Sequence, residues 1–206
     1  MINERLGLEN FLDPKKRMDA RLESEISALG KKRVVLVILN SLEYADIGQN
    51  LLPFFEKQGQ AGIFVSVNKP AVNIIAGSPA KAFAQKSVEF VDCVSRISGT
   101  RESESPKIHY LESPQQLVEL SELLTQMVAS GEARFLVLDS LSTLLIYNKP
   151  ESIEKFVHTL STRVRAQNVL GIFLIVKTEQ NRDAVRVLSQ FCDAVIEIGE
   201  KKFESK

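Results

Sequence analysis

Five short stretches of this 206-residue chain are dominated by Val, Ile, Leu and Phe, with little alternation of apolar and polar positions. Strands that are buried on both faces have this pattern, because the crossover helices of a parallel sheet cover each side. The predicted strands are residues 33–39, 62–67, 135–138, 171–176 and 194–198. The pattern therefore predicts an α/β protein built on a mainly parallel central sheet.

Between the predicted strands, apolar residues recur every three or four positions, as they do on the buried face of a helix. In residues 114–131 this spacing places Leu120 and Leu124 on one face, and Gly131 supplies a stop signal. Ser113 is expected to cap this helix, with a proline at its first position. Similar patterns predict helices in residues 14–30, in residues 150–168 and from Ala184 onward.

The length and the alternation of strands and helices indicate one main domain, to which we assign residues 33–199. Residues 1–32 form a predicted N-terminal helical extension, and residues 200–206 form a predicted flexible tail. The extension is expected either to pack on the rim of the domain or to dock on another subunit. Residues 99–107 are polar and lack an apolar anchor, which predicts a mobile loop.

Lysine plus arginine and aspartate plus glutamate each total 26, so the formal net charge is zero. A global field that would favour nucleic acid or acidic membranes is therefore not expected. The charged N-terminus lacks the apolar core of a signal peptide, and no apolar run approaches the roughly 20 residues of a membrane span. We expect a cytoplasmic protein without a membrane partner, and nucleic acid is a disfavoured partner that stays open.

The stretch ARFLVLDSLSTLL, residues 133–145, ends a predicted strand in Asp139, which Ser140 and Ser142 follow. The carboxyl ends of parallel strands form the edge at which open α/β sheets bind ligands. An aspartate there can hold Mg²⁺ directly or through water, because it is a hard oxygen ligand on a rigid element. Asp139 is therefore the candidate metal ligand, and the alternative is that it ends the strand and caps the next turn.

The strand ending in DSLS, the strand GIFLIVKTEQ and the closing CDAVIEIG occur in an order that resembles the RecA superfamily, specifically KaiC-like ATPase domains of the archaeal type. The resemblance extends upstream through GQAGIFVSVNKP to RVVLVILN and covers residues 33–198. It implies a three-layer, RecA-like P-loop NTPase fold with helices on both faces of the sheet. Numbered along the chain, the five predicted strands would lie in the order 5-1-4-3-2, joined by right-handed crossovers.

ATPases of this family hold the phosphates in a Gly-x-x-x-x-Gly-Lys-Ser/Thr loop, which corresponds here to residues 40–52. Glycines let backbone N–H groups turn toward the phosphates, the lysine neutralises their charge, and the hydroxyl binds Mg²⁺. This segment has one glycine and neither lysine nor arginine, and its two acids would repel an anion. The residues of this degenerate phosphate loop are Asn40, Ser41, Glu43, Asp46 and Gly48.

A second catalytic feature of the family is also missing. KaiC-like ATPases usually place a glutamate after the second strand to polarise the attacking water, but this chain has Asn68 and Lys69 there. We therefore assign no catalytic residue and favour a protein that is not an enzyme. If a nucleotide binds, the candidate contacts are Asp139, Ser140 and Thr178, because all three follow strands at the same edge of the sheet.

Three functions remain open. The first is a non-catalytic KaiC/RecA-like domain, a pseudo-ATPase that needs no cofactor and serves as a regulatory or scaffolding subunit. Its partner would be a second copy in a homo-oligomer or a paralogue with an intact phosphate loop. The second is a nucleotide-binding sensor or atypical ATPase that uses Asp139 with ATP and Mg²⁺. The third is a DNA-associated accessory protein related to recombinase paralogues, which fold analogy alone supports.

Overall fold

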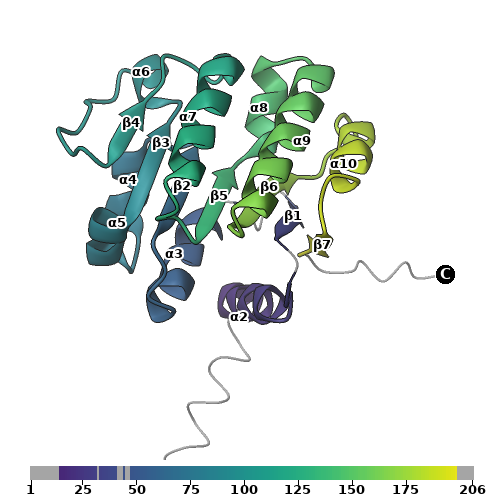
Figure 1. Cartoon of the computed structure of the whole chain (residues 1–206), viewed down its shortest axis with the longest axis horizontal. Coiled ribbons are helices and arrows are strands. Elements are labelled where there is room, and N and C mark those ends of the chain that lie inside the picture. The colour runs from purple at the N-terminus through teal and green to yellow at the C-terminus, as the bar shows by residue number, and fades with distance from the viewer. Residues whose placement is uncertain (1–13, 32, 41–43, 45–46, 199–206) are drawn as a thin grey trace, which may run out of the picture.

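The computed structural model describes residues 14–31, 33–40, 44 and 47–198. Within these residues, seven strands form one sheet in the order β4-β3-β2-β5-β6-β1-β7, and every neighbouring pair is parallel (Figure 1). The strands are β1 (Val34–Leu39), β2 (Gly62–Ser66), β3 (Val88–Asp92), β4 (Ile108–Tyr110), β5 (Phe135–Asp139), β6 (Leu170–Val176) and β7 (Ala194–Glu197). The predicted α/β class with a parallel central sheet is confirmed.

The five predicted strands lie in the predicted order. Read from β7, the neighbours are β7-β1-β6-β5-β2, which is the order 5-1-4-3-2 that the RecA resemblance implied. Two strands that the sequence analysis did not predict, β3 and β4, extend the sheet beyond β2. They gave a weak signal because Glu89 interrupts the apolar run of β3, and β4 is only three residues long.

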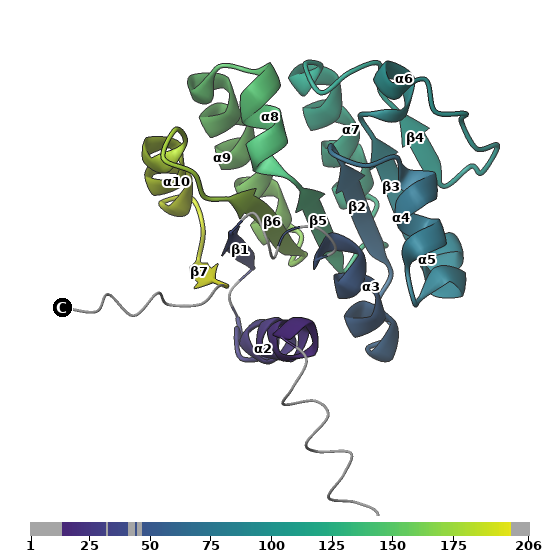
Figure 2. The same ribbon diagram turned by 180° about the vertical axis from the view of Figure 1, so that it is seen from behind.

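Helices cover both faces of the sheet, which gives the three layers that the resemblance implied (Figures 1 and 2). The described helices are α2 (Pro14–Ser27), α3 (Ile47–Lys57), α4 (Ala71–Gly77), α5 (Lys81–Ser87), α6 (Ser95–Ser98), α7 (Leu117–Ala129), α8 (Leu141–Tyr147), α9 (Pro150–Ala166) and α10 (Arg182–Ser189). Buried side chains of α7, α8, α9 and α10 form one apolar cluster with the sheet. Those of α2, α3, α4 and α5 form a second cluster with the opposite face.

The predicted cap of α7 is wrong. The helix begins at Leu117, and no side-chain cap hydrogen bond joins its N-terminus. The Oγ atom of Ser113 instead accepts from the backbone N–H of Gln115 over 3.2 Å, and Oε1 of Gln116 accepts from that of Glu112 over 2.7 Å. Both polar side chains therefore stabilise the turn that precedes the helix.

The helix α2 packs on the domain, which is one of the two alternatives for the N-terminal extension. Leu22 and Ile26 are buried in the same apolar cluster as β1 and α3. The guanidinium of Arg21 donates to the backbone carbonyl of Glu197 in β7 over 3.2 Å. The predicted tail, residues 200–206, lies outside the described residues. In the described part of the chain, none of the helices combines the length and the apolarity of a membrane span.

Polar contacts hold the loop of residues 99–107 at two points, and its expected mobility stays a prediction. The guanidinium of Arg96 forms an ion pair with Glu102 at 2.7 Å. The backbone N–H of Ser103 donates to the hydroxyl of Tyr110 in β4, also over 2.7 Å. Polar contacts supply the attachment that apolar residues would otherwise give.

Candidate functional site

The first candidate site lies at the carboxyl edge of the sheet, where β5 ends and α8 begins. Asp139 is the last residue of β5 and is paired in register with Ser66, the last residue of β2. Ser140 follows directly before α8, and the peptide bond between Asp139 and Ser140 is cis. The backbone N–H of Val67 donates to the carbonyl of Asp139 over 2.7 Å. Two neighbouring strands thus fix the backbone of Asp139.

Tyr44, from the loop between β1 and α3, contacts Asp139 directly. Its hydroxyl donates to Oδ1 of Asp139 over 2.5 Å, although the two residues are far apart in the chain. Asp139 is only 8% exposed. A carboxylate so deeply buried needs hydrogen-bond donors, and Tyr44 supplies one. The candidate metal ligand therefore already has a partner from the protein itself.

The pKa values of the two residues follow from this contact. Burial raises the pKa of Asp139 from 3.8 to about 6, while the Tyr44 hydrogen bond and the positive charge of Lys69 oppose that rise. Burial also raises the pKa of Tyr44, and the charge of Asp139 and their hydrogen bond raise it further. Hydrogen bonding to Ser140 and Asn68 acts in the opposite direction. At neutral pH, Tyr44 is therefore a protonated donor and Asp139 a mainly ionised acceptor.

Asp139 ends β5, as the alternative interpretation stated, but its side chain does not cap the following helix. No side-chain cap hydrogen bond joins the N-terminus of α8, and the carboxylate of Asp139 bonds to Tyr44 instead. A different residue holds α8 in place. The Oγ atom of Ser142 accepts from the backbone N–H of Val176 over 2.6 Å, which ties α8 to the end of β6.

The predicted phosphate loop falls only partly within the described residues. Its members that lie outside them are Ser41, Glu43 and Asp46. Asn40 is exposed directly after β1, and Gly48 belongs to the first turn of α3. Sequence reasoning missed Tyr44, which reaches Asp139 from this segment. The available signal was that Tyr44 is the sole aromatic residue in 40–52.

A groove of about 980 Å³ opens at the carboxyl ends of β1, β6 and β7, between α2 and α10. The residues that line it include Arg21, Asn40, Lys177, Thr178, Arg182 and Val195. Thr178 lines this groove, but Asp139 and Ser140 do not. The structure therefore brings two of the three predicted nucleotide contacts together with Tyr44 and places the third in a separate depression.

Local hydrogen bonds hold Thr178 in this position. Its backbone N–H donates to Oδ1 of Asn181 over 2.9 Å, and its Oγ1 accepts from the backbone N–H of Asn181 over 3.3 Å. Beside it, Nζ of Lys177 lies 3.0 Å from Oε1 of Glu197. The groove is therefore lined by both basic and acidic side chains, and Lys177, the cation next to Thr178, already forms an ion pair.

The surroundings of Asp139 do not form a metal site by themselves. Among the described residues there is no group of three or more His, Cys, Asp or Glu side chains that could hold an ion. Mg²⁺ can bind through one carboxylate when substrate phosphates complete its shell. Here the carboxylate of Asp139 accepts a hydrogen bond from the Tyr44 hydroxyl and lies near the charge of Lys69. Those neighbours fit a self-contained polar cluster better than a cation.

Comparison with solved structures supports the fold. The chain is similar to a KaiC-like protein from the hyperthermophilic archaeon Pyrococcus horikoshii OT3, with a TM-score of 0.57 over 84% of this chain and 75% of that one. Because only 14% of the residues are identical, this likeness establishes the KaiC-like, RecA-type fold alone. No curated protein matches the chain.

A family model provides the assignment that the structural likeness cannot give. It matches residues 53–198, which span β2 to β7, the C-terminal part of α3 and the candidate residues Asp139, Ser140 and Thr178. Its description is a family of unknown function, DUF7504. The match covers well over half of the chain, so this protein belongs to the DUF7504 family.

Proposed function

We propose that this protein is a non-catalytic KaiC/RecA-like domain that acts as a regulatory or scaffolding subunit. The observation that carries the proposal is the 2.5 Å hydrogen bond from the Tyr44 hydroxyl to Oδ1 of Asp139. An aspartate at the end of β5 would need a free oxygen to hold Mg²⁺ beside a nucleotide. Tyr44 engages Oδ1, one of the two carboxylate oxygens, and so competes with a cation for the charge of Asp139.

The charges around Asp139 support the same proposal. Lys69 lies close enough for its charge to lower the Asp139 pKa, so a cation stands near the aspartate. It follows β2, where KaiC-like ATPases usually carry a glutamate that polarises water. At neutral pH neither Lys69 nor Asn68 can serve as a general base. The carboxyl edge therefore carries one buried acid and its partners, without the groups that activate water.

ATP turnover by the purified protein tests this proposal. The Asp139→Asn variant, which lacks the acid, serves as the baseline. We expect the unmodified protein to hydrolyse ATP no faster than this variant, with or without Mg²⁺. The Tyr44→Phe variant should also be inactive, because freeing one carboxylate oxygen of Asp139 does not create a phosphate-binding loop. Hydrolysis by the unmodified protein that disappears in Asp139→Asn would refute the proposal.

A regulatory subunit needs a partner, and we propose that a second copy or a paralogue with an intact phosphate loop binds at the carboxyl edge. Three large apolar side chains are exposed there, on the start of α7 and on α8. They are Val118 at 68%, Ile146 at 78% and Tyr147 at 40% exposed. We call these three residues the carboxyl-edge apolar face. Such clusters on a protein surface often mark interaction sites.

The groove lined by Asn40 and Thr178 favours a second candidate, a nucleotide sensor. Its volume of about 980 Å³ lies within the range of small-molecule sites, and Arg21 and Arg182 could contact phosphates. A ligand that binds only the native state raises the melting temperature by mass action. A rise with Mg-ATP that Arg182→Ala abolishes would favour the sensor. No shift at millimolar nucleotide would reject it.

A further inference from the structure

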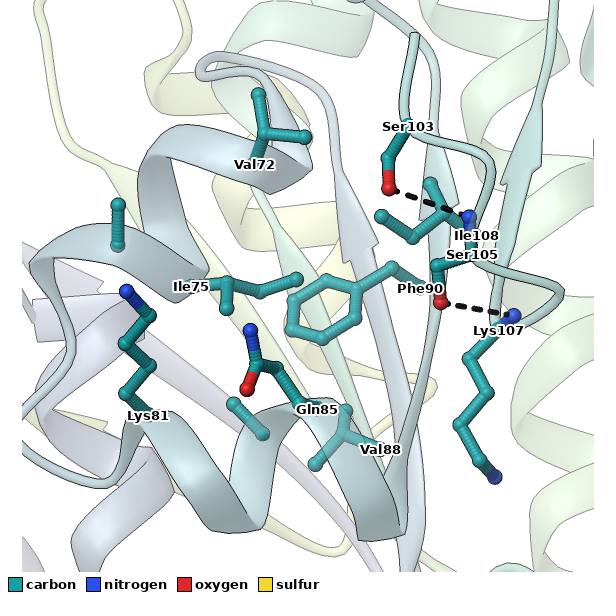
Figure 3. Close-up of a pocket in the computed structure, with 12 residues that line it drawn as sticks. Val72, Ile75, Lys81, Gln85, Val88, Phe90, Ser103, Ser105, Lys107 and Ile108 are labelled. Atoms are coloured by element: carbon teal, nitrogen blue, oxygen red, sulfur yellow. Dashed lines mark hydrogen bonds between the residues drawn. The ribbon is translucent and has the colours of Figure 1, made fainter.

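A second cavity lies at the opposite edge of the sheet from the groove. Helices α4 and α5, the strands β3 and β4 and the loop before β4 surround it, and its volume is about 320 Å³ (Figure 3). This volume is near the lower end of the range for small-molecule sites. Asp139, Tyr44 and Thr178 do not line it. The cavity is thus independent of the residues on which the proposed function rests.

The inner wall of this cavity is apolar. Side chains from four elements form it, and each is at most 8% exposed. They are Ile75 of α4, Ala84 of α5, Val88 and Phe90 at the start and middle of β3, and Ile108 of β4. In Figure 3 the ring of Phe90 faces Ile75 across the cavity. A wall of this kind favours an apolar body in the ligand.

The outer part of the cavity is polar and positively charged. Lys81 and Lys107 stand on opposite sides, with the amide of Gln85 between them (Figure 3). No aspartate or glutamate lines the cavity, and Glu104 in the neighbouring loop does not take part. The ammonium groups of the two lysines form no hydrogen bond or ion pair with another described residue. An anion at the mouth would therefore meet cations that have no competing partner.

The loop side of the cavity is already ordered. The backbone N–H of Ser105 donates to Oγ of Ser103 over 3.2 Å, and that of Lys107 to Oγ of Ser105 over 3.4 Å. The backbone N–H of Ser103 bonds in turn to the hydroxyl of Tyr110 in β4. Because these contacts already hold the loop in the absence of a ligand, binding would lose little conformational entropy of the loop.

We propose that this cavity binds a small organic acid that has an apolar body and one terminal carboxylate. The apolar body would lie against Phe90 and Ile75, and the carboxylate would face Lys81, because Lys107 stands on the opposite side of the cavity. A neutral apolar molecule would leave Lys81 without a partner. Inorganic phosphate would leave the apolar wall unfilled. The two halves of the cavity together select a ligand that combines both properties.

Binding of octanoate to the full chain tests the proposal, with octanol as a neutral probe of the same length and phosphate as a headgroup alone. Chemical-shift changes in NMR spectra locate the site, and calorimetry measures the affinity. We expect octanoate to shift the amide signals of α5 and β4 and to bind more tightly than either control. Octanol that binds as well as octanoate would overturn the assignment of an acid.

Variants connect the binding to this cavity. Lys81→Gln should weaken octanoate binding about threefold, the modest effect of one exposed charge, and Lys107→Gln should weaken it less because Lys107 stands on the opposite side of the cavity. Lys86→Gln is the matched control, because Lys86 lies on the same helix α5 and does not line the cavity. Ala76→Phe should block the cavity, and since Ala76 is exposed, the core should tolerate the change. Far-ultraviolet circular dichroism checks the fold of each variant.

Three further results would overturn the proposal. The first is the absence of binding at millimolar octanoate. The second is binding that persists in folded Ala76→Phe, which would place the ligand elsewhere. The third is a loss of affinity in Lys86→Gln as large as that in Lys81→Gln, because it would reflect the general charge of α5 and not the cavity.

Discussion

Tyr44 and Asp139 form a hydrogen-bonded unit at the residue scale, and each changes the proton affinity of the other. The bond stabilises the charged form of Asp139, whereas the buried carboxylate makes Tyr44 harder to ionise. Lys69 adds a favourable charge. A buried acid with these partners is stable inside the protein, although removing one partner leaves the acid poorly compensated.

The first prediction concerns that partner. Tyr44→Phe removes the donor to Asp139 and should lower the free energy of unfolding by about 2 kcal/mol at neutral pH, because hydrogen bonds to charged groups contribute this much. The Asp139 pKa should rise above its present value of about 6, since the lost bond favoured the carboxylate. Chemical denaturation measures the first effect, and an NMR titration of the carboxyl carbon measures the second.

Tyr147→Phe is the control for this experiment. Tyr147 also follows β5 in the chain, but it is 40% exposed on α8. We expect neither the stability nor the Asp139 titration to change in that variant. An unchanged Asp139 pKa in Tyr44→Phe would contradict the hydrogen bond on which the proposed function depends.

The second prediction is a pH dependence of stability. The folded-state pKa of Asp139, about 6, lies above its ordinary value of 3.8, so the native chain binds more protons between these pH values. The stabilisation is fully present below pH 3.8 and is lost as the pH rises through about 6. At about 1.4 kcal/mol for each pH unit, this loss is about 3 kcal/mol.

The variant Asp139→Asn isolates this contribution, because an amide does not titrate. The stability difference between the unmodified protein and Asp139→Asn should shift against the unmodified protein by about 3 kcal/mol from acidic to neutral pH. Urea denaturation at several pH values gives this difference. Parallel pH profiles for the two proteins would show that Asp139 has an ordinary pKa.

At the element scale, the sequence predicted a strand correctly where an unbroken run of apolar residues marked it. The strands β1, β5 and β6 are nearly unbroken apolar runs, and they were found with their order. The charged residues that end or interrupt β3 hid that strand. Its last residue, Asp92, is fully buried and accepts from the backbone N–H groups of Ala71, Val94 and Ser95 over 2.7 to 2.9 Å. The contacts with Val94 and Ser95 are local, whereas the contact with Ala71 joins β3 to a segment that only the folded chain brings close.

In the candidate site, too, some features were predictable from the sequence and others were not. Asp139 and Ser140 were placed correctly at the end of a strand, because an apolar run that stops at an acid is visible in the sequence. The bond to Tyr44 depends on how the loop after β1 crosses to β5, which no local pattern encodes. The separation of Thr178 from Asp139 likewise depends on the path of the chain after β6.

The third prediction concerns the contact between β2 and β5. Gly62 is paired in register with Phe135, and a Cβ atom added at Gly62 would lie 2.5 Å from the ring. The ring cannot move away, because it is fully buried and stacks on Phe55 with 3.7 Å between centroids. Gly62→Ala should therefore lower the free energy of unfolding by about 2 kcal/mol, as overpacking does.

A double-mutant cycle separates this clash from a backbone effect of glycine. In the Phe135→Leu background the same Gly62→Ala change should cost much less, because the ring that it meets is gone. Urea denaturation of the four proteins gives the coupling energy. Equal costs in both backgrounds would show that the ring does not require the glycine.

At the scale of the whole molecule, the edge of the sheet that carries Asp139 also carries exposed apolar side chains. The amide of Asn148 donates to the carbonyl of Pro114 over 2.9 Å, which joins the end of α8 to the segment before α7. Ile146 lies in α8, and Val118 lies in the first turn of α7, directly after that segment. This hydrogen bond links the ends of the two segments that carry the exposed apolar side chains, which favours the carboxyl-edge apolar face as one surface for a partner.

The fourth prediction is that this face mediates association between two copies. Ile146→Glu should weaken a dimer about tenfold or more, because a charge would be buried in the centre of the interface. Val195→Glu is the matched control, since Val195 is 46% exposed on β7 at the far end of the sheet and should leave the dimer intact. Light scattering over a range of concentrations measures both. A protein that stays monomeric at high concentration would contradict self-association and leave the paralogue as the partner, and equal weakening by both variants would move the interface away from α8.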